Sequence, residues 1–351
     1  MKRTLKNHNN MKLLKKLYAI HSKSGREKNM KRFIDMYVKQ NLPSCSIRED
    51  EKGNIYITKG LSENYPCIVA HLDQVQETHS KDFRAVETDG IIFGFSQLNR
   101  RQEGLGADDK NGIWIALRCL RRYDTLKVAF FVEEEVGCLG SSNADMDFFQ
   151  DTRFVIEPDR RGRGDLITSI GGMELCSTEF LQATHYEQFG YKEADGMMTD
   201  IDALKDNGLP VSCINLSCGY YCPHTSTEFT VVHDLLNCKA LVEHIIENCT
   251  DVYPHISPFY GRGCTYADCI DDYYSDFYDL LANNPTMNFE EFYWGYGYYF
   301  SDMTKQQMQD FFNEVRNDMR TLEEESGESD NKNQENQSFL KHDHGHQHRT
   351  L

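Results

Sequence analysis

The sequence lacks any apolar run long enough to cross a membrane. Its 351 residues contain nothing near the roughly 20 consecutive apolar residues that a membrane-spanning helix needs. The basic residues at positions 1–16 are not followed by an apolar core and a small-residue cleavage site, so they do not form a secretory signal. We therefore expect a protein that neither spans a membrane nor enters the secretory route.

Positive charge is also scarce. The chain has 38 lysines and arginines against 55 aspartates and glutamates, which gives a formal net charge of -17. Part of the excess is local, because residues 323–330 are mostly acidic. Binding to nucleic acid or to an anionic membrane requires positive surface. We therefore expect neither nucleic acid nor membrane as a partner.

Closely spaced cysteine pairs are missing as well. None of the 12 cysteines forms a Cys-x-x-Cys motif, and Cys67, Cys119 and Cys213 lie inside apolar runs. In such runs cysteine behaves as a small buried hydrophobic residue. A domain of this size does not need a disulfide framework. The pattern predicts free thiols in a reducing, cytoplasmic setting.

The sequence does contain short apolar runs that alternate with amphipathic segments. Runs bounded by polar or glycine residues predict buried strands, and strands are also expected at 166–170 and 174–180. Helical spacing predicts a helical hairpin over 11–40 and helices over 109–122, 199–208 and 232–248. This alternation predicts an α/β fold with a mostly parallel, doubly covered central sheet in three layers.

Composition divides the chain into three parts. Residues 1–250 carry the pattern of strands and helices, whereas residues 251–321 are rich in aromatic and acidic side chains and are expected to form a small, mainly helical appendage. Residues 322–351 are rich in Glu, Ser, Asn, Gln and His. Such a segment cannot bury enough apolar surface to fold, so we expect a disordered acidic and His-rich tail.

Ligand-type side chains follow several of the predicted strands. They lie after apolar runs at 67–70, 128–132, 154–156 and 211–216, or open the glycine-flanked segment 106–112; they are His71, Asp73, Asp108, Glu134, Glu135, Asp159 and His224. In open α/β sheets, ligands bind outside the carboxyl ends of the strands. His, Asp and Glu repeated at that edge predict a metal site.

A hydrolytic site with two metals needs oxygen and nitrogen ligands and one carboxylate that both ions share. This chain supplies such a set. His71 and Asp159 are expected to hold one ion, and Glu135 and His224 the other. Asp108 would bridge the two ions. The candidate ligands therefore match the chemistry of a two-metal hydrolase.

Two further carboxylates have expected roles beside the ligands. Asp73 lies two residues from His71, where it would accept the second N–H of the imidazole and fix its tautomer. Glu134 neighbours a ligand, and a carboxylate beside two cations is suited to take a proton from the attacking water and pass it to the leaving amine. We expect Glu134 to be the general base.

Three motifs resemble those of the co-catalytic di-zinc exopeptidases. They are His71-Leu72-Asp73, the segment Gly-Ala-Asp-Asp-Lys-Asn-Gly at 106–112, and Glu134-Glu135-Val136-Gly137. That group includes tripeptidase T, the glutamyl aminopeptidases, the glutamate carboxypeptidases and succinyl-diaminopimelate desuccinylase. The resemblance covers about residues 11–250, and the three motifs together are far more specific than any one alone.

The resemblance implies the same assignments. His71, Asp108, Glu135, Asp159 and His224 would be the metal ligands, and Glu134 the general base. The cofactors would be two divalent metal ions, expected to be zinc, with cobalt or manganese as alternatives. The substrate would be a small peptide or an N-acyl amino acid.

Two ligands have rivals. Glu157 competes with Asp159, because Glu157-Pro158 resembles the Glu-Pro of the deacylase branch. We prefer Asp159, since residues 159–166 resemble the Asp-Gly-Gly…Gly-Glu-Leu run of the tripeptidase branch. His224, with Glu228 after it, resembles the His…Glu pattern near the end of these domains. His233 is its weaker rival because it lies at the start of a predicted helix.

Thr199-Asp200 resembles a Thr-Asp pair that lies near the active site in the glutamyl aminopeptidase branch. The pair also begins a predicted helix, and Thr and Asp are favoured N-cap residues. We interpret Thr199-Asp200 as a helix cap.

The intervals between ligands are too short for the lid or dimerisation domain that some branches insert. Such a domain needs at least about 50 residues beyond the core elements. We expect a catalytic core without a lid, closer in layout to the single-domain bacterial leucyl aminopeptidases. The predicted function is a metal-dependent exopeptidase, either an aminopeptidase or a small-peptide hydrolase. The alternatives are a zinc-dependent amidase or deacylase of N-acyl amino acids or cell-wall peptides, and a non-catalytic binding protein on a peptidase fold.

Overall fold

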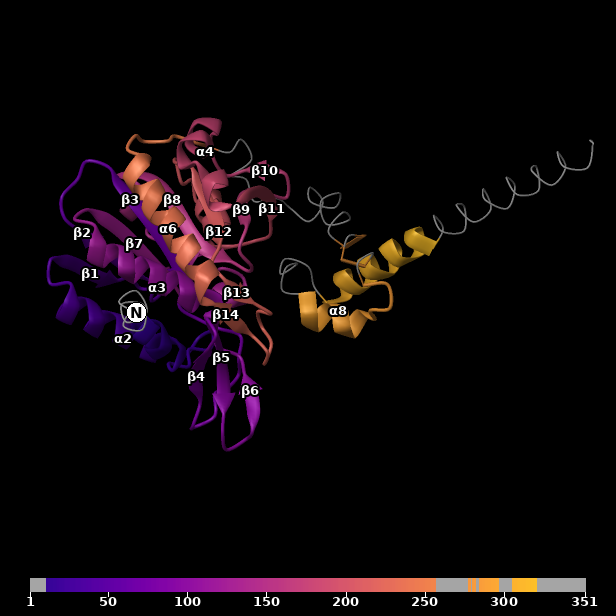
Figure 1. Cartoon of the computed structure of the whole chain (residues 1–351). Helices are drawn as coiled ribbons and strands as arrows, with labels where there is room; N and C mark the ends of the chain where they lie inside the picture. Colours follow the sequence, from indigo (N-terminus) through magenta and orange to yellow (C-terminus); the bar gives the residue numbers. More distant parts are fainter. Residues whose placement is uncertain (1–10, 257–276, 279, 282–283, 297–304, 321–351) are drawn as a thin grey trace, which may run out of the picture. The chain divides into compact units, whose positions relative to one another are not determined.

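The computed structural model describes residues 11–256, 277–278, 280–281, 284–296 and 305–320 (Figure 1). The chain divides into two compact units, Met1–Arg262 and Gly263–Leu351. The tail expected at residues 322–351 lies outside the described residues.

The described part of the first unit is built on a nine-stranded sheet. The strand order is β1-β2-β7-β3-β8-β12-β9-β10, and β11 pairs with β9. The central strands β7, β3, β8 and β12 are parallel, and antiparallel pairs flank them on both sides. The strands are β1 (Cys45–Glu49), β2 (Ile55–Lys59), β3 (Tyr65–His71), β7 (Leu126–Phe131), β8 (Thr152–Arg160), β9 (Asp165–Ile170), β10 (Met173–Glu174), β11 (Lys192–Gly196) and β12 (Cys213–Ser217). This arrangement confirms the predicted α/β fold.

Helices cover both faces of this sheet. On β3, Ile68 and Ala70 belong to the core cluster that contains residues of α2 (Lys28–Asn41), α3 (Ala107–Arg122), α4 (Thr178–Thr184) and α6 (Val232–Asn248). The alternate residues Cys67 and Val69 pack in a second cluster with residues of α5 (Asp200–Asp206) and the 3-10 helix Met146–Phe149. Because both faces of β3 are buried, its sequence is a continuous apolar run, as expected for a central parallel strand.

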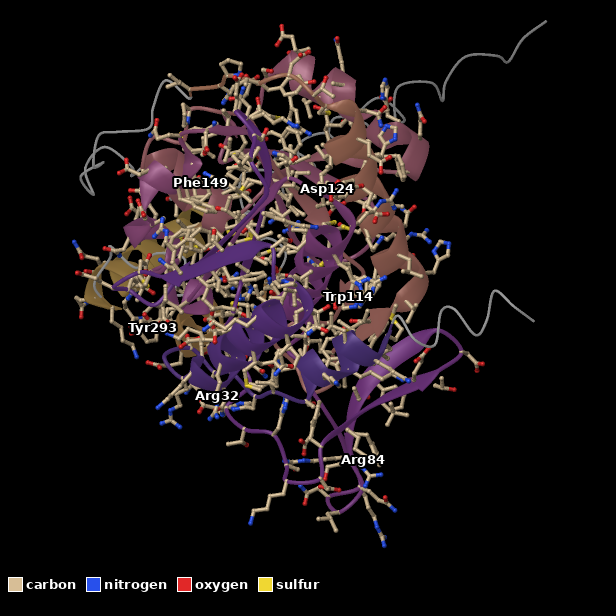
Figure 2. All side chains as sticks on the ribbon, turned by 90° about the vertical axis from the view of Figure 1, so that its left-hand side faces the viewer. Arg32, Arg84, Trp114, Asp124, Phe149 and Tyr293 are labelled. Atoms are coloured by element: carbon tan, nitrogen blue, oxygen red, sulfur yellow. The ribbon has the colours of Figure 1, made fainter. Side chains whose placement is uncertain are left out.

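Helix α3 covers the face of the sheet to which Ile68 and Ala70 point, and nearly all of its residues are buried. Trp114 of α3 is fully buried among the packed side chains, whereas Arg32 on α2 and Arg84 on a peripheral strand point outward (Figure 2). Burying one large apolar side chain contributes roughly 1.5–3 kcal/mol to stability. The position of α3 is therefore strongly fixed, and with it the position of the segment at its N-terminus.

Most predicted elements of the first unit are confirmed, but one is wrong. Residues 11–18 and α2 form the helical hairpin, and β1 pairs with β2 in antiparallel orientation. The strand expected over 174–180 ends at Glu174, and α4 begins at Thr178. The hydroxyl of Ser177 accepts a hydrogen bond from the N–H of Phe180 and caps that helix. A short apolar alternation does not distinguish a strand from the first turn of an amphipathic helix.

A second, five-stranded sheet joins two distant stretches of the chain. Its order is β13-β14-β5-β4, and β6 pairs with β5. These strands are β4 (Arg84–Thr88), β5 (Ile91–Ser96), β6 (Arg101–Glu103), β13 (Tyr220–Tyr221) and β14 (Phe229–Val231). Strands β4, β5 and β6 extend beyond the main sheet at the bottom of Figure 1. The sheet brings the loop at 222–228 beside the segment that leads into α3.

The described part of the second unit is helical. It contains α8 (Phe289–Tyr296) and a helix over residues 305–320. Its buried apolar side chains form a core of their own, in which the ring centroids of Phe277 and Phe292 are 4.5 Å apart. The predicted helical C-terminal part is therefore present. Among the helices that the structure describes in either unit, none is both long enough and apolar enough to span a bilayer.

Candidate metal centre

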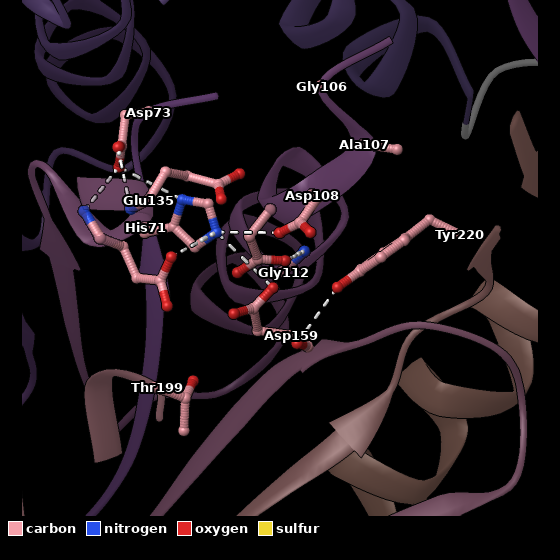
Figure 3. A network of polar contacts seen from close by, with 12 residues as sticks. His71, Asp73, Gly106, Ala107, Asp108, Gly112, Glu135, Asp159, Thr199 and Tyr220 are labelled. Carbon is pink, nitrogen blue, oxygen red and sulfur yellow. Dashed lines mark hydrogen bonds and ion pairs between the residues drawn. The ribbon is translucent and has the colours of Figure 1, made fainter. Parts of the chain in front are cut away.

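Three of the predicted ligands converge at the carboxyl edge of the main sheet. His71 ends β3, Asp108 lies in the first turn of α3, and Glu135 lies in the 3-10 helix Glu134–Val136 after β7. One ligand atom from each lies within 4.8 Å of the others, so the group could hold a metal ion. Figure 3 shows the imidazole of His71 surrounded by carboxylates from separate segments.

His71 lies against two of the expected partners. Its Nε2 atom is 3.0 Å from Oδ1 of Asp108 and 3.7 Å from Oδ1 of Asp159. The His71 side chain has no exposed surface. The structure thus places His71, Asp108 and Asp159 together, as the predicted first metal position requires.

His224 lies on the other side of Asp108. Its Nε2 atom is 3.0 Å from Oε2 of Glu135 and 3.4 Å from Oδ2 of Asp108. The two oxygens of Asp108 therefore face two different imidazoles, Oδ1 toward His71 and Oδ2 toward His224. A carboxylate that bridges two ions needs this arrangement. The peptide bond between Asp108 and Asp109 is cis.

Asp73 supports both His71 and the segment that follows β7. Its Oδ1 atom is 3.3 Å from Nδ1 of His71. Its carboxylate accepts hydrogen bonds from the N–H groups of Glu134 (3.0 Å) and Glu135 (3.2 Å) and from the hydroxyl of Ser24 (2.7 Å). Burial would raise the pKa of Asp73, but His71 and these donors lower it. Asp73 is thus held as an anion that orients the imidazole.

Glu134 points toward the group from beside Glu135. Its Oε2 atom is 3.9 Å from Nε2 of His71, and the thiol of Cys138 donates to its Oε1 atom at 3.7 Å. The chain turns at Glu133, which has a positive φ of 54°. The carboxylate of Glu133 is held by Lys52 Nζ at 2.7 Å. This turn allows the next two glutamates to face the centre.

Burial and mutual repulsion dominate the electrostatics. Burial raises the pKa of Glu134 and of Asp159 well above the ordinary values, and neighbouring carboxylates raise both further. Burial alone would lower the pKa of His71, but Asp159, Glu134 and Asp108 outweigh it and raise that pKa. Burial would also lower the pKa of His224, but Asp108 and Glu135 outweigh it and raise that pKa to about 12.

The donor set fits two divalent cations. Asp108, Glu134, Glu135 and Asp159 would carry four negative charges, which two divalent ions would balance. Oε1 of Glu135 and Oδ1 of Asp159 are among the buried side-chain atoms that have no hydrogen-bond partner in the described part of the chain, as is Oε1 of Glu157. Buried polar atoms are normally satisfied, so such atoms at a cluster of ligands indicate a missing partner. Imidazole and carboxylate together are the ligands that zinc uses in catalytic sites.

The rival ligands lie elsewhere. Oε2 of Glu157 accepts a hydrogen bond from the hydroxyl of Thr199 at 2.7 Å, whereas Asp159 lies against His71. The side chain of His233 is 89% exposed, and its Nδ1 atom is paired with Asp234 at 3.1 Å. Asp159 lies 3.7 Å from His71, and His224 lies beside Asp108 and Glu135. The choice of these two over Glu157 and His233 stays a prediction.

The interpretation of Thr199-Asp200 as a helix cap is wrong for the threonine hydroxyl. Thr199 is the N-cap residue of α5, but its side chain caps no N–H group and donates to Glu157 instead. Thr and Asp before a helix are typical of capping, so capping was preferred over the resemblance that placed this pair near the active site. Thr199 belongs to a polar layer under Asp159, which it reaches through Asn215.

Asp200 is a buried acid beside that layer. Neither of its carboxylate oxygens makes a hydrogen bond within the described part of the chain. Ser141 lies beside it, but the Ser141 hydroxyl donates to the carbonyl oxygen of Cys138. Burial raises the pKa of Asp200 to about 7. The signal in the sequence was the resemblance of Thr199-Asp200 to a pair near the active site in the glutamyl aminopeptidase branch, which we set aside in favour of helix capping.

Glu228 is a further residue whose contacts were not predicted. It is fully buried and accepts hydrogen bonds from the N–H groups of Gly106, Ala107 and Asp108. The only sequence signal was its position four residues after His224. Glu228 therefore belongs to the support of the centre, although it is not placed as a ligand.

Comparisons with known proteins give similarity in fold alone. No family model and no curated protein matches the chain. Three similar solved structures are the aminopeptidase PepT of Bacillus cereus (15% identity, TM-score 0.55), a tripeptidase of Staphylococcus aureus (14%, 0.56) and an aminopeptidase of the archaeon Desulfurococcus kamchatkensis (17%, 0.52). They cover 69%, 68% and 74% of this chain, and 98%, 97% and 99% of their own lengths. The chain therefore has the fold of these peptidases, which confirms at the level of fold the resemblance seen in its motifs.

Proposed function

We propose that this protein is a two-metal exopeptidase, either an aminopeptidase or a hydrolase of small peptides. One observation carries the proposal: Asp108 presents one oxygen to His71 and the other to His224, with Glu134 beside them. The fold of the solved aminopeptidases and tripeptidase supports a peptide as the substrate. Fold alone does not define function, so the site carries the argument.

The ligands divide into two sets that share Asp108. His71 and Asp159 would hold one ion, and Glu135 and His224 the other. When bound, two divalent ions, expected to be zinc with cobalt or manganese as alternatives, polarise the scissile carbonyl and make a water molecule more acidic.

Glu134 would move the proton in this reaction. Its carboxylate is largely buried within the cluster, and burial raises its pKa. A raised pKa suits a group that first accepts a proton from the attacking water and then delivers it to the leaving amine. The backbone hydrogen bonds from Glu134 and Glu135 to Asp73 hold the base and its neighbouring ligand in register with His71.

The cysteines support the expected compartment. All ten cysteines that the structure describes are free thiols. Free buried thiols are typical of proteins in a reducing cytoplasm. We propose that location for the enzyme.

The substitution Glu134→Gln tests the proposed function. It removes the proton acceptor but keeps the shape of the side chain, so we expect two bound ions per chain and a loss of about 10²- to 10⁴-fold in the rate of peptide hydrolysis. Metal content and the rate on peptides with a free amino terminus are the measurements. Glu243→Gln is a matched control, because Glu243 is also a partly buried glutamate but pairs with Arg122 and Lys239 on the helical face.

Hydrolysis by Glu134→Gln at close to the wild-type rate would show that Glu134 is not the base. Equal rates on N-blocked and free-amine peptides would favour the amidase alternative over an aminopeptidase. Wild-type protein that takes up no zinc, cobalt or manganese would contradict the metal centre and favour a binding protein on this fold.

A further inference from the structure

The carboxylate of Glu228 ties the last part of the first unit to the turn that carries Asp108. Oε2 accepts the N–H of Gly106 at 2.6 Å, and Oε1 accepts those of Ala107 at 2.9 Å and Asp108 at 3.2 Å. Gln76 donates a fourth hydrogen bond to Oε2 at 3.3 Å. The Glu228 side chain is fully buried, so these donors are its environment within the described residues.

These hydrogen bonds give the backbone N–H groups at the start of α3 an acceptor from a distant part of the chain. The N-cap residue Gly106 has no side chain to cap the first N–H groups, and its φ of 60° places it in the left-handed region. Asp108 and Asp109 have non-helical φ and ψ, so the N–H groups of Gly106, Ala107 and Asp108 belong to a turn before the regular part of α3. Buried backbone N–H groups that no helix or strand pairs need another acceptor, and Glu228 supplies it.

The same residue closes the loop that carries His224. That loop runs from the end of β13 to the start of β14, so Glu228 is its last residue before the strand. His224 itself has a positive φ of 62°, and Thr225, Ser226 and Thr227 are exposed. A β-carbon on Gly104 would lie 2.5 Å from the carbonyl oxygen of Thr225, so the loop rests directly on the backbone there.

We propose that Glu228 is a positioning residue that sets the separation between the two metal positions by fixing the Asp108 turn relative to the His224 loop. This inference rests on the proposed function, because it assigns Glu228 a role toward the same two ions. Both Glu228 oxygens already accept hydrogen bonds, so Glu228 acts through Asp108 and His224 and is not a ligand. Only a carboxylate has two acceptor oxygens for this set of N–H donors.

The substitution Glu228→Gln separates positioning from a merely structural role. The glutamine keeps one acceptor oxygen and turns an N–H₂ group toward another donor, so at least one hydrogen bond to the turn is lost. We expect the second cobalt ion to bind at least tenfold more weakly, with a changed visible spectrum of the bound cobalt. We also expect faster hydrogen exchange at the amides of 106–108 in the metal-free full-length chain.

Glu103→Gln is the matched control. Glu103 is also a buried glutamate whose carboxylate accepts a backbone N–H, that of Ser80 at 2.9 Å, but it joins no ligand segment. We expect Glu103→Gln to change the unfolding temperature without changing cobalt affinity, the cobalt spectrum or exchange at 106–108. A structural role for Glu228 would make both variants behave alike.

Gly104→Ala gives a second perturbation that leaves Glu228 intact. The added methyl group would meet the carbonyl oxygen of Thr225 at 2.5 Å and the Gln76 side chain at 2.7 Å, so it displaces the His224 loop and also presses on a donor to Glu228. We expect the same selective weakening of the second cobalt ion. This variant keeps the test decisive if Glu228→Gln does not fold.

Two outcomes would overturn the inference. One is wild-type affinity, spectrum and amide exchange in Glu228→Gln, and the other is equal weakening of both ions in Gly104→Ala. Failure of the proposed function looks different, because the wild-type chain would then bind no cobalt at all. In that case the exchange rates at 106–108 still decide whether Glu228 holds the turn.

Discussion

The two halves of the centre differ in how firmly the fold holds them. In the buried half, His71 ends a strand that pairs on both sides, and its side chain has no exposed surface. In the open half, His224 lies on a loop between two short strands, and its side chain is 37% exposed. If the proposed function is right, we expect the buried half to hold its ion more tightly and the open half to exchange its ion and receive the substrate.

The supporting contacts follow the same division. Asp73 lies beside His71 and bonds to three further groups of the chain. His224 has no comparable acidic support among the described residues apart from Glu135 and Asp108, which are themselves expected ligands. Outer-shell partners of this kind typically change metal affinity 10- to 100-fold.

Removing one imidazole from each half should produce the largest contrast. We expect His71→Ala to lose both ions, because it removes a ligand from the tight position and leaves buried carboxylates without compensation. We expect His224→Ala to keep one ion per chain. Metal content after dialysis measures both. Retention of one ion by His71→Ala and of none by His224→Ala would reverse the comparison.

Replacing Asp200 measures how much a buried acid near the buried half of the centre costs in stability. Burial raises the pKa of Asp200 from 3.8 to about 7 in the folded protein, so the protonated form favours folding. This contribution to the free energy of unfolding is complete below about pH 4 and is lost as the pH rises through 7. The neutral variant Asp200→Asn should therefore equal the wild type at pH 4 and exceed its metal-free stability at pH 8. A shift of about three pKa units corresponds to at most about 4 kcal/mol.

Denaturant unfolding of the metal-free proteins at the two pH values measures this effect. Ser141→Ala is a useful companion, since it removes the neighbouring hydroxyl but no charge. An Asp200→Asn variant that is less stable than the wild type at pH 8 would show that Asp200 is ionised and satisfied in the fold.

Asp73→Asn should affect the buried half more than the open half. The amide keeps the volume of the side chain but has only one acceptor oxygen for the imidazole, the two N–H groups and the Ser24 hydroxyl. We expect the tighter ion to bind 10- to 100-fold more weakly, and the weaker ion to be affected less, through the N–H group of Glu135. Stepwise competition with a chelator resolves the two affinities. Equal losses at both positions would mean that Asp73 supports the whole centre.

The smallest effect is expected for His233→Ala. His233 points into solvent and pairs with Asp234, so its loss should leave metal content and peptide hydrolysis unchanged. Loss of one ion in this variant would identify His233 as the ligand in place of His224.

The parts of this site that were predictable from the sequence lie directly after apolar strands. His71, Asp108 and Glu135 follow or precede runs whose burial is readable, and parallel strands bring such ends to one edge. Their convergence was therefore expected. Asp73 could be placed for the same reason, because it lies two residues from His71.

The parts that could not be predicted depend on contacts between distant segments. The pairing of β14 with β5 places Glu228 under the Asp108 turn, but no local pattern encodes which strands of the second sheet pair. Thr199 bonds to Glu157 instead of capping α5, since the polar layer under Asp159 competes for its hydroxyl. The segment after Glu174 shows the same limit, because local alternation did not distinguish a strand from a capped helix.

The order of the ligands along the chain has a consequence for biosynthesis. His71, Asp108, Glu135 and Asp159 are synthesised before His224 and Glu228. The core elements β12 and α6 flank these last two residues in the sequence, so they are also synthesised late. Contacts between residues so far apart form only after the intervening chain has been ordered. A nascent chain that ends before His224 would therefore hold an acidic cluster but no second metal position. The proposed hydrolytic activity would thus require translation of nearly all of the first unit.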